Sequence, residues 1–178
     1  MTDHKTQEPI KFKMTGDIID KIIYKDGRVE VIESHNLVVN SFLPLISSLL
    51  KRDSNYTGIQ YWAIGSGSPS WDETLPSPQS TDTQLTSELG RVAIPLSEMV
   101  YLDNHFEESQ DPTPILQIKH TFDENTLNGS WREFGIFGGN ATSAVNSGYM
   151  INHKIHPLIS KTSEMVVERT MRFTISLT

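Results

Sequence analysis

The sequence predicts a mainly β protein, an antiparallel sandwich or barrel-like domain with one main α-helix at about residues 37–51. Three observations support this prediction: a hairpin pattern near the start, one stretch of helical periodicity, and several short strand-like segments separated by polar or glycine-containing breaks. The helix would cover an open end or one face of the sheets. The 178 residues fit a single domain at 15–178, with residues 1–14 as a candidate N-terminal arm.

The opening hairpin is the clearest local pattern. Residues 9–14 and 17–24 are predicted as strands because they are rich in Ile, Phe and Tyr. Asp26-Gly27 follows, and its glycine accepts the positive φ that a tight turn requires. Residues 28–33 then alternate charged and apolar side chains, so we predict a hairpin over about residues 17–33.

A helical period begins at Leu37. Apolar residues recur at positions 37, 38, 39, 42, 43, 45, 46, 49 and 50, which places them on one wide face of a helix. Asn36 is suited to cap this helix. Pro44 argues against an uninterrupted helix and predicts either a place in the first turn or a kink.

The rest of the chain is predicted to be strands joined by loops. Residues 59–68 indicate a buried strand that ends in a glycine turn. Residues 69–89 are rich in Pro, Ser, Thr and Asp and predict a long irregular excursion, a kind of loop that is usually functional and that we expect to lie on a neighbour in an assembly. Further strands are predicted at 91–100, 114–122, 131–137, 149–155 and 165–177, the last with a clean alternation.

Composition excludes several classes of protein. The chain has no cysteine, so it has no disulfide framework and no thiolate metal site, which fits assembly in a reducing cytoplasm. Its net charge of −7 lacks the positive field of a nucleic-acid-binding protein, so no nucleic-acid partner is expected. The apolar run at 37–50 is too short and too polar to span a bilayer, and the polar N-terminus is no secretory signal, so no membrane partner is expected.

Motifs that would indicate an enzyme are weak. Gly65-Ser-Gly67-Ser lacks the spacing and the lysine of a phosphate-binding loop, and no GxSxG elbow is present. His153 and His156 lie three apart on a predicted strand, so their side chains point to opposite faces and would not share a metal. We therefore predict that the chain is not an enzyme, and we assign it no catalytic, cofactor-binding or metal-ligating residue. The remaining acidic pairs are read as solvated loops, with weak cation binding left open; they are Asp72–Glu73, Glu107–Glu108, Asp111 and Asp123–Glu124.

The densest aromatic segment is residues 131–139, WREFGIFGG. We favour a core strand over a platform that stacks sugars or bases, because its glycines allow another backbone to approach closely. Alternation predicts one face with Arg132, Phe134 and Ile136 and the other with Trp131, Glu133, Gly135 and Phe137. A buried charge requires a partner. The candidates are Arg91 and Arg169 for Glu133, and Glu88 or Glu168 for Arg132.

Seven segments, taken in order, give the chain a resemblance to a family of small bacteriophage virion proteins of the tail, baseplate or fibre-attachment type. They are HNLVVNSFLPLISSLL (35–50), YWAIGSG (61–67), TQLTSELGR (83–91), HTF (120–122), WREFGIFGG (131–139), SGYMINHKIHPLISKT (147–162) and ERTMRFTISL (168–177). The resemblance implies a structural virion component and supplies no catalytic residue. Departures from the pattern are Pro44 in the helix and the long spacer at 69–80.

We therefore expect a tail, baseplate or fibre-attachment protein that acts through symmetric assembly, located in the virion and assembled in the host cytoplasm. A capsid decoration or a neck or collar protein is the alternative within this class. The expected partners are further copies of the chain and other virion structural proteins, contacted through the helix face and residues 69–89. A carbohydrate-binding module for host attachment, with a host glycan as the less favoured partner, is the alternative of another class. It requires an exposed aromatic residue, and Trp71 is expected to be the most exposed of Trp62, Trp71 and Trp131.

Overall fold

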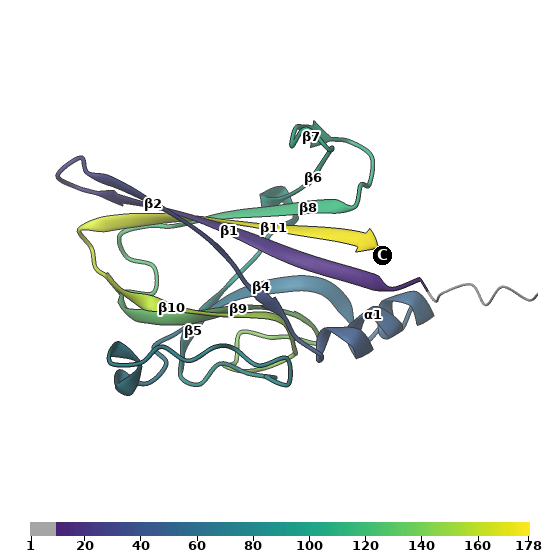
Figure 1. The fold of residues 1–178 in the computed structure, drawn as a ribbon, viewed down its shortest axis with the longest axis horizontal. Helices are drawn as coiled ribbons and strands as arrows, with labels where there is room; N and C mark the ends of the chain where they lie inside the picture. Colours follow the sequence, from purple (N-terminus) through teal and green to yellow (C-terminus); the bar gives the residue numbers. More distant parts are fainter. Residues whose placement is uncertain (1–9) are drawn as a thin grey trace, which may run out of the picture.

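The computed structural model describes residues 10–178, and these residues form two antiparallel sheets that face each other as a β-sandwich (Figure 1). The mainly β prediction is confirmed, and of the two predicted architectures the sandwich is the one observed, because neither sheet closes into a barrel. Sheet A has the order β2 (Val29–His35), β1 (Phe12–Tyr24), β11 (Met165–Leu177), β8 (Ile115–Phe122), β6 (Met99–Leu102), β7 (Glu108–Ser109). Sheet B has the order β3 (Leu37–Val38), β10 (Tyr149–Lys161), β9 (Gly129–Gly139), β4 (Thr57–Gly65), β5 (Glu88–Ala93).

The predicted hairpin is confirmed, and its first strand is longer than expected. β1 pairs with β2 from Asp17–His35 to Ile23–Val29, and Gly27 in the turn has a φ of 88°. The predicted segments 9–14 and 17–24 merge into one strand that also pairs with β11 along its whole length. Residues 12–14 of the candidate arm are therefore part of sheet A, and residues 1–9 lie outside the described part of the chain.

The helix is confirmed but begins later than predicted. α1 spans Phe42–Lys51, while Leu37 and Val38 form the short strand β3 against β10. Asn36 is not the cap, because its backbone N–H donates to the carbonyl of Gly16 and the residue at the cap position is Ser41. The strand pairing before the helix takes the backbone groups that a longer helix would need. Pro44 lies in the first turn, one of its two predicted positions, where its missing N–H has no helical partner to lose.

The irregular excursion predicted at residues 69–89 is observed over residues 69–87, because its last two residues belong to strand β5. Its only regular element among the described residues is the short 3-10 helix η1 (Pro69–Asp72), before β5 begins at Glu88. The prediction of one strand at 91–100 is wrong. β5 belongs to sheet B and β6 to sheet A, and the chain crosses between the sheets through η2 (Leu96–Glu98). Pro95, which cannot donate a ladder hydrogen bond, marks the break.

Aromatic side chains fill the space between the sheets. Trp62 of β4, Phe122 of β8 and Phe134 of β9 are fully buried and pack edge-on or tilted against one another. Trp131 joins this cluster, with its ring centroid 5.0 Å from that of Phe122. The prediction that Trp131 shares a face with Glu133 is therefore wrong, because Trp131 belongs to the core between the sheets, whereas Glu133 binds the backbone of Thr86 and Ser87 outside this core. The pairing of β9 with β10 also shifts register in this region, between Ile155 and Ile159.

Candidate functional site

An apolar groove lies at the end of the sandwich next to α1, lined by side chains of both sheets and of the helix. It has a volume of about 630 Å³. Met14 and Ile175 of sheet A, Ile59 of sheet B and Leu45 of α1 are among the side chains that line it. Figure 1 shows α1 beside this end, next to the end of β11. The helix was expected to cover an open end or one face of the sheets; α1 lies at this end and lines the groove but leaves it accessible.

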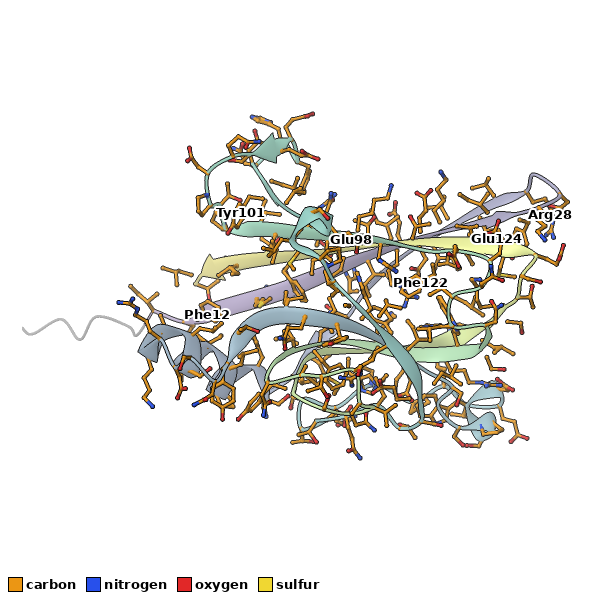
Figure 2. The ribbon with its side chains drawn as sticks, turned by 180° about the vertical axis from the view of Figure 1, so that it is seen from behind. Phe12, Arg28, Glu98, Tyr101, Phe122 and Glu124 are labelled. Atoms are coloured by element: carbon orange, nitrogen blue, oxygen red, sulfur yellow. The ribbon has the colours of Figure 1, made fainter. Side chains whose placement is uncertain are left out.

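Sheet A extends past the groove with apolar side chains that no other layer formed by residues 10–178 covers. Phe12 pairs with Leu177 one step beyond the groove-lining pair Met14–Ile175, so these residues share a face of the sheet. Phe12 is 51% exposed, Leu177 70%, and Leu96 at the edge of the groove 84%. Figure 2 shows Phe12 at the same end of the molecule as α1, and Arg28 at the opposite end. We call the groove and these surrounding residues the open end.

The face of sheet B that points away from sheet A is covered by another segment of the same chain. Residues 80–87, which we call the strap, run across this face (Figure 1). The carbonyl of Ser80 accepts from the N–H of Asn40, and the N–H of Ser66 donates to the carbonyl of Ser87. Leu85 is completely buried in a second apolar cluster with Phe137. This part of the excursion, which was expected to lie on a neighbouring molecule, therefore packs against sheet B of its own chain.

A buried ionic network fastens the strap. Glu133 of β9 is fully buried, and its carboxylate accepts hydrogen bonds from the backbone N–H groups of Gly67 (3.2 Å), Thr86 (3.1 Å) and Ser87 (2.9 Å). The fourth partner is His153 of β10, with Nε2 3.1 Å from Oε2 of Glu133. Nδ1 of the same ring lies 2.7 Å from Oδ2 of Asp82. A carboxylate thus faces each ring nitrogen, an arrangement that holds the imidazole in its doubly protonated form.

The environment sets the charge of both groups. Burial alone would raise the pKa of Glu133, but the hydrogen bonds from His153, Ser87 and Thr86 outweigh burial and lower this pKa below its usual value. For His153, burial favours the neutral ring, and the hydrogen bonds to Glu133 and Asp82 reverse this and raise its pKa. The network therefore favours a carboxylate on Glu133 and an imidazolium on His153, both withdrawn from solvent.

The predicted ion-pair partners of Glu133 and Arg132 are wrong. Arg132 forms a two-fold contact with Asp72 of η1, at 2.9 and 2.7 Å, in place of Glu88 or Glu168. Arg91 pairs with Glu88 and Arg169 with Asp20. Periodicity places charges on a face of a strand but does not say which loop covers that face. Asp72, which binds Arg132, and the amides of Thr86 and Ser87, which bind Glu133, all come from the excursion.

A second buried ion pair lies between the sheets. Arg169 is completely buried, and its guanidinium donates to the carboxylate of Asp20 at 2.6 and 2.8 Å. The guanidinium carbon also lies 4.0 Å from the centroid of the Phe134 ring. His156 is near this pair; burial, and then the charge of Arg169, lower its pKa to about 4. His156 is therefore neutral at pH 7, in surroundings separate from those of His153, as their opposite-face placement predicts.

The remaining sequence candidates are dispersed. The Gly65–Ser68 turn ends β4 as predicted, and the N–H of Gly67 is bound to Glu133. Trp62 and Trp131 are completely buried while Trp71 is only partly covered, as predicted. Trp71 packs on Gly67 and lines a hollow of about 390 Å³ with Asp72, Glu73, Leu75, Pro157 and Leu158. The other acidic groups, Glu107, Glu108, Asp111 and the Asp123–Glu124 pair, lie in or beside loops between strands.

Within residues 10–178, no group of three or more histidine or acidic side chains is arranged to hold a metal ion. The helices of the same range include none that is long and apolar enough to cross a bilayer. Comparison of the chain with protein-family models, with curated proteins and with solved structures finds no match.

Proposed function

We propose that the chain is a structural component of a phage-type virion, of the tail, baseplate or fibre-attachment type, and that it acts by assembling into a symmetric homo-oligomer with other virion proteins around it. The observation that supports this proposal is the open end. Large apolar side chains are exposed there among the residues that the structure describes, and exposed patches of this kind mark protein interfaces. They are Ile10, Phe12, Leu43, Leu49, Leu50, Leu96, Ile175 and Leu177.

The size of this surface suits an assembly contact. At roughly 100 Å² of exposed surface per side chain, the eight offer on the order of 800 Å², which is what one partner contributes to a standard protein interface. Part of the wide apolar face predicted for the helix belongs to it, because Leu43 and Leu50 are exposed on the flank of α1.

The proposal gives the chain no catalytic step. His153 is the histidine most deeply placed among carboxylates, and it is only 3% exposed with both ring nitrogens hydrogen-bonded. An imidazole in that state has no free nitrogen with which to remove a proton from a substrate. This arrangement supports a fastening role for the network.

Two measurements test the proposed function. Sedimentation of the purified chain over a range of concentrations is expected to show a closed oligomer, because the open end remains available in the monomer. Mass spectrometry of purified particles from the host that carries the gene is expected to find the chain in a fixed ratio to other virion proteins. A chain that is monomeric at every concentration and absent from particles refutes the proposal.

A carbohydrate-binding role is the second candidate, favoured by the hollow at Trp71. An aromatic ring beside Asp72 and Glu73 offers a stacking surface and hydrogen-bond acceptors for sugar hydroxyls. Binding to a host cell-wall glycan that is lost in Trp71→Ala and kept in Leu75→Ala would establish this role. No binding by the wild-type chain to a host cell-wall extract would exclude it.

A further inference from the structure

Lys161, the last residue of β10, is a buried lysine whose hydrogen-bond partners are all neutral. It is 1% exposed. Its Nζ donates to the backbone carbonyls of Asp123 at 2.7 Å and Thr162 at 3.2 Å, and to the side-chain Oδ1 of Asn128 at 3.0 Å. None of these three acceptors is a carboxylate oxygen. An ammonium buried in this way lacks a direct counter-charge, so burial favours a form of the side chain without the charge.

The loop at residues 123–128, between β8 and β9, fixes the amide of Asn128 against this lysine. The indole N–H of Trp131, a fully buried residue, donates to the carbonyl of Leu127 at 2.7 Å and anchors the end of the loop. Nδ2 of Asn128 donates to the carbonyl of Glu124 at 2.8 Å, which leaves the carbonyl side of the amide turned toward Lys161. Because Cγ is one bond of about 1.2 Å from Oδ1, an electrophilic carbon lies within about 4.2 Å of Nζ.

Burial also prepares Lys161 to act as a nucleophile. Burial lowers the pKa of Lys161, and the nearby charges of Asp123 and Glu124 oppose this effect only in part. The neutral amine keeps two N–H groups, which suffice for the carbonyls of Asp123 and Thr162. Its lone pair then points in the third direction, toward the amide of Asn128. A desolvated lysine beside a carbonyl carbon is the arrangement that nucleophilic lysines require.

We propose that Lys161 and Asn128 react with each other to form an intramolecular isopeptide bond. The ammonium first gives one proton to the carboxylate of Asp123 or Glu124, which passes it to solvent. The lone pair of Nζ then attacks Cγ of Asn128 and forms the Nζ–Cγ bond. The Cγ–Nδ2 bond breaks, and Nδ2 keeps the electron pair, takes the second proton that Nζ loses, and leaves as ammonia. An amine and a carboxamide thus become a secondary amide and ammonia, with no oxidant, reductant or added reagent.

The bond ties the loop between β8 and β9 to the end of β10. Figure 2 shows Glu124, in this loop, at the end of the molecule opposite Phe12, so the cross-link and the open end lie at opposite ends. Fixed proximity of the two groups supplies most of what such a reaction needs. In a chain without cysteine, the cross-link provides the constraint on the unfolded chain that a disulfide provides elsewhere. The inference is independent of the proposed function.

Intact-mass spectrometry of the purified full chain tests the bond. The expected mass is about 17 Da below that of the sequence, because one ammonia is lost. Incubation at about pH 9 for a day before the measurement increases the amine form of lysine and drives the reaction to completion. Trypsin does not cut after an acylated lysine, so the digest is expected to contain one branched peptide made of residues 120–132 and 155–169.

Three variants assign the loss of ammonia to these two residues. Lys161→Met and Asn128→Ala each remove one reactant, and neither is expected to lose ammonia. Lys154→Met is the matched control, because it makes the same substitution on the same strand. Lys154 donates to the backbone carbonyl of His35, a group that it cannot displace, so this control is expected to retain the loss. The mass and the branched peptide of the wild-type chain decide the matter even where a variant fails to fold.

A competing reaction gives the same mass and is separated by these measurements. In Asn128-Gly129, the backbone nitrogen of Gly129 can attack Cγ and release ammonia as a succinimide forms. A succinimide needs no lysine, opens in alkali and gives no branched peptide. A loss of ammonia that persists in Lys161→Met, or that occurs without the branched peptide, therefore refutes the isopeptide bond. A wild-type chain that has the full mass of its sequence after the alkaline incubation refutes it as well.

Discussion

Replacing Glu133 with Gln tests how the strap is held. The carboxylate of Glu133 accepts four hydrogen bonds, from three backbone N–H groups and from His153. A glutamine side chain has one acceptor oxygen and one NH₂ group, so at least one edge of the new amide must face two donors. The substitution changes neither the length nor the shape of the side chain, and it isolates hydrogen bonding and charge from packing.

The expected cost follows from these contacts. Each buried donor left without an acceptor costs about 1–3 kcal/mol, and the imidazolium of His153 also loses one of its two charge partners. We expect Glu133→Gln to lower the free energy of unfolding by about 3–5 kcal/mol. For a domain of this size that corresponds to a fall in Tm of roughly 6–20 °C.

Equilibrium unfolding in urea at pH 7 measures this loss, and hydrogen exchange at the amides of Thr86 and Ser87 locates it, because both amides donate to Glu133. Glu73→Gln is the matched control, since Glu73 is exposed and in the same excursion, and we expect it to change stability by less than about 0.5 kcal/mol. A cost below about 1 kcal/mol for Glu133→Gln, with unchanged exchange at both amides, would refute the reasoning.

Two further predictions concern the other buried charges. Asp20→Asn leaves Arg169 buried without its counter-charge, and we expect it to lower the free energy of unfolding in urea by about 3–5 kcal/mol. Asp20→Leu combined with Arg169→Met removes both charges, and its free energy of unfolding should fall within about 2 kcal/mol of that of the wild-type chain. Equal costs for the single and the double replacement would contradict this prediction. The contribution of His153 has a sign fixed by its raised pKa: it is complete below about pH 6.5 and is lost as the pH rises through the folded-state pKa. Glu133, whose pKa is lowered, contributes above about pH 4.5 and less as the pH falls further. The difference in free energy of unfolding between the wild-type chain and His153→Gln should therefore be largest between about pH 4.5 and 6.5 and should shrink at alkaline pH. Unfolding curves recorded over this pH range measure the difference, and the separate effect of His156 cancels because it is present in both proteins. A difference independent of pH would contradict the prediction.

Local patterns predicted the elements that depend on neighbours in the chain. The hairpin at Asp26-Gly27 and the alternation of β11 needed only periodicity and one turn residue, and both are confirmed. The helix was found by its period, but its start was misplaced because Leu37 and Val38 pair with β10, more than a hundred residues further along the chain. No window of sequence that ends near residue 50 contains that information.

The candidate surfaces divide in the same way. The sequence indicated a wide apolar helix face and an excursion with little regular structure, and it indicated that Glu133 and Arg132 would require partners. It did not show that Glu133 would bind His153 and the backbone of the strap, or that Arg132 would bind Asp72, because these choices depend on how the excursion folds back over sheet B.

The amino-acid sequence by itself determined that this chain would form short antiparallel strands with one helix, because the period of apolar residues and the turn residues act over a few positions. Only the tertiary structure decided where charge is buried and where apolar surface is left exposed. Both depend on which distant segments cover each face: the strap covers Glu133 and His153, whereas no segment among residues 10–178 covers Phe12, Leu96 and Leu177.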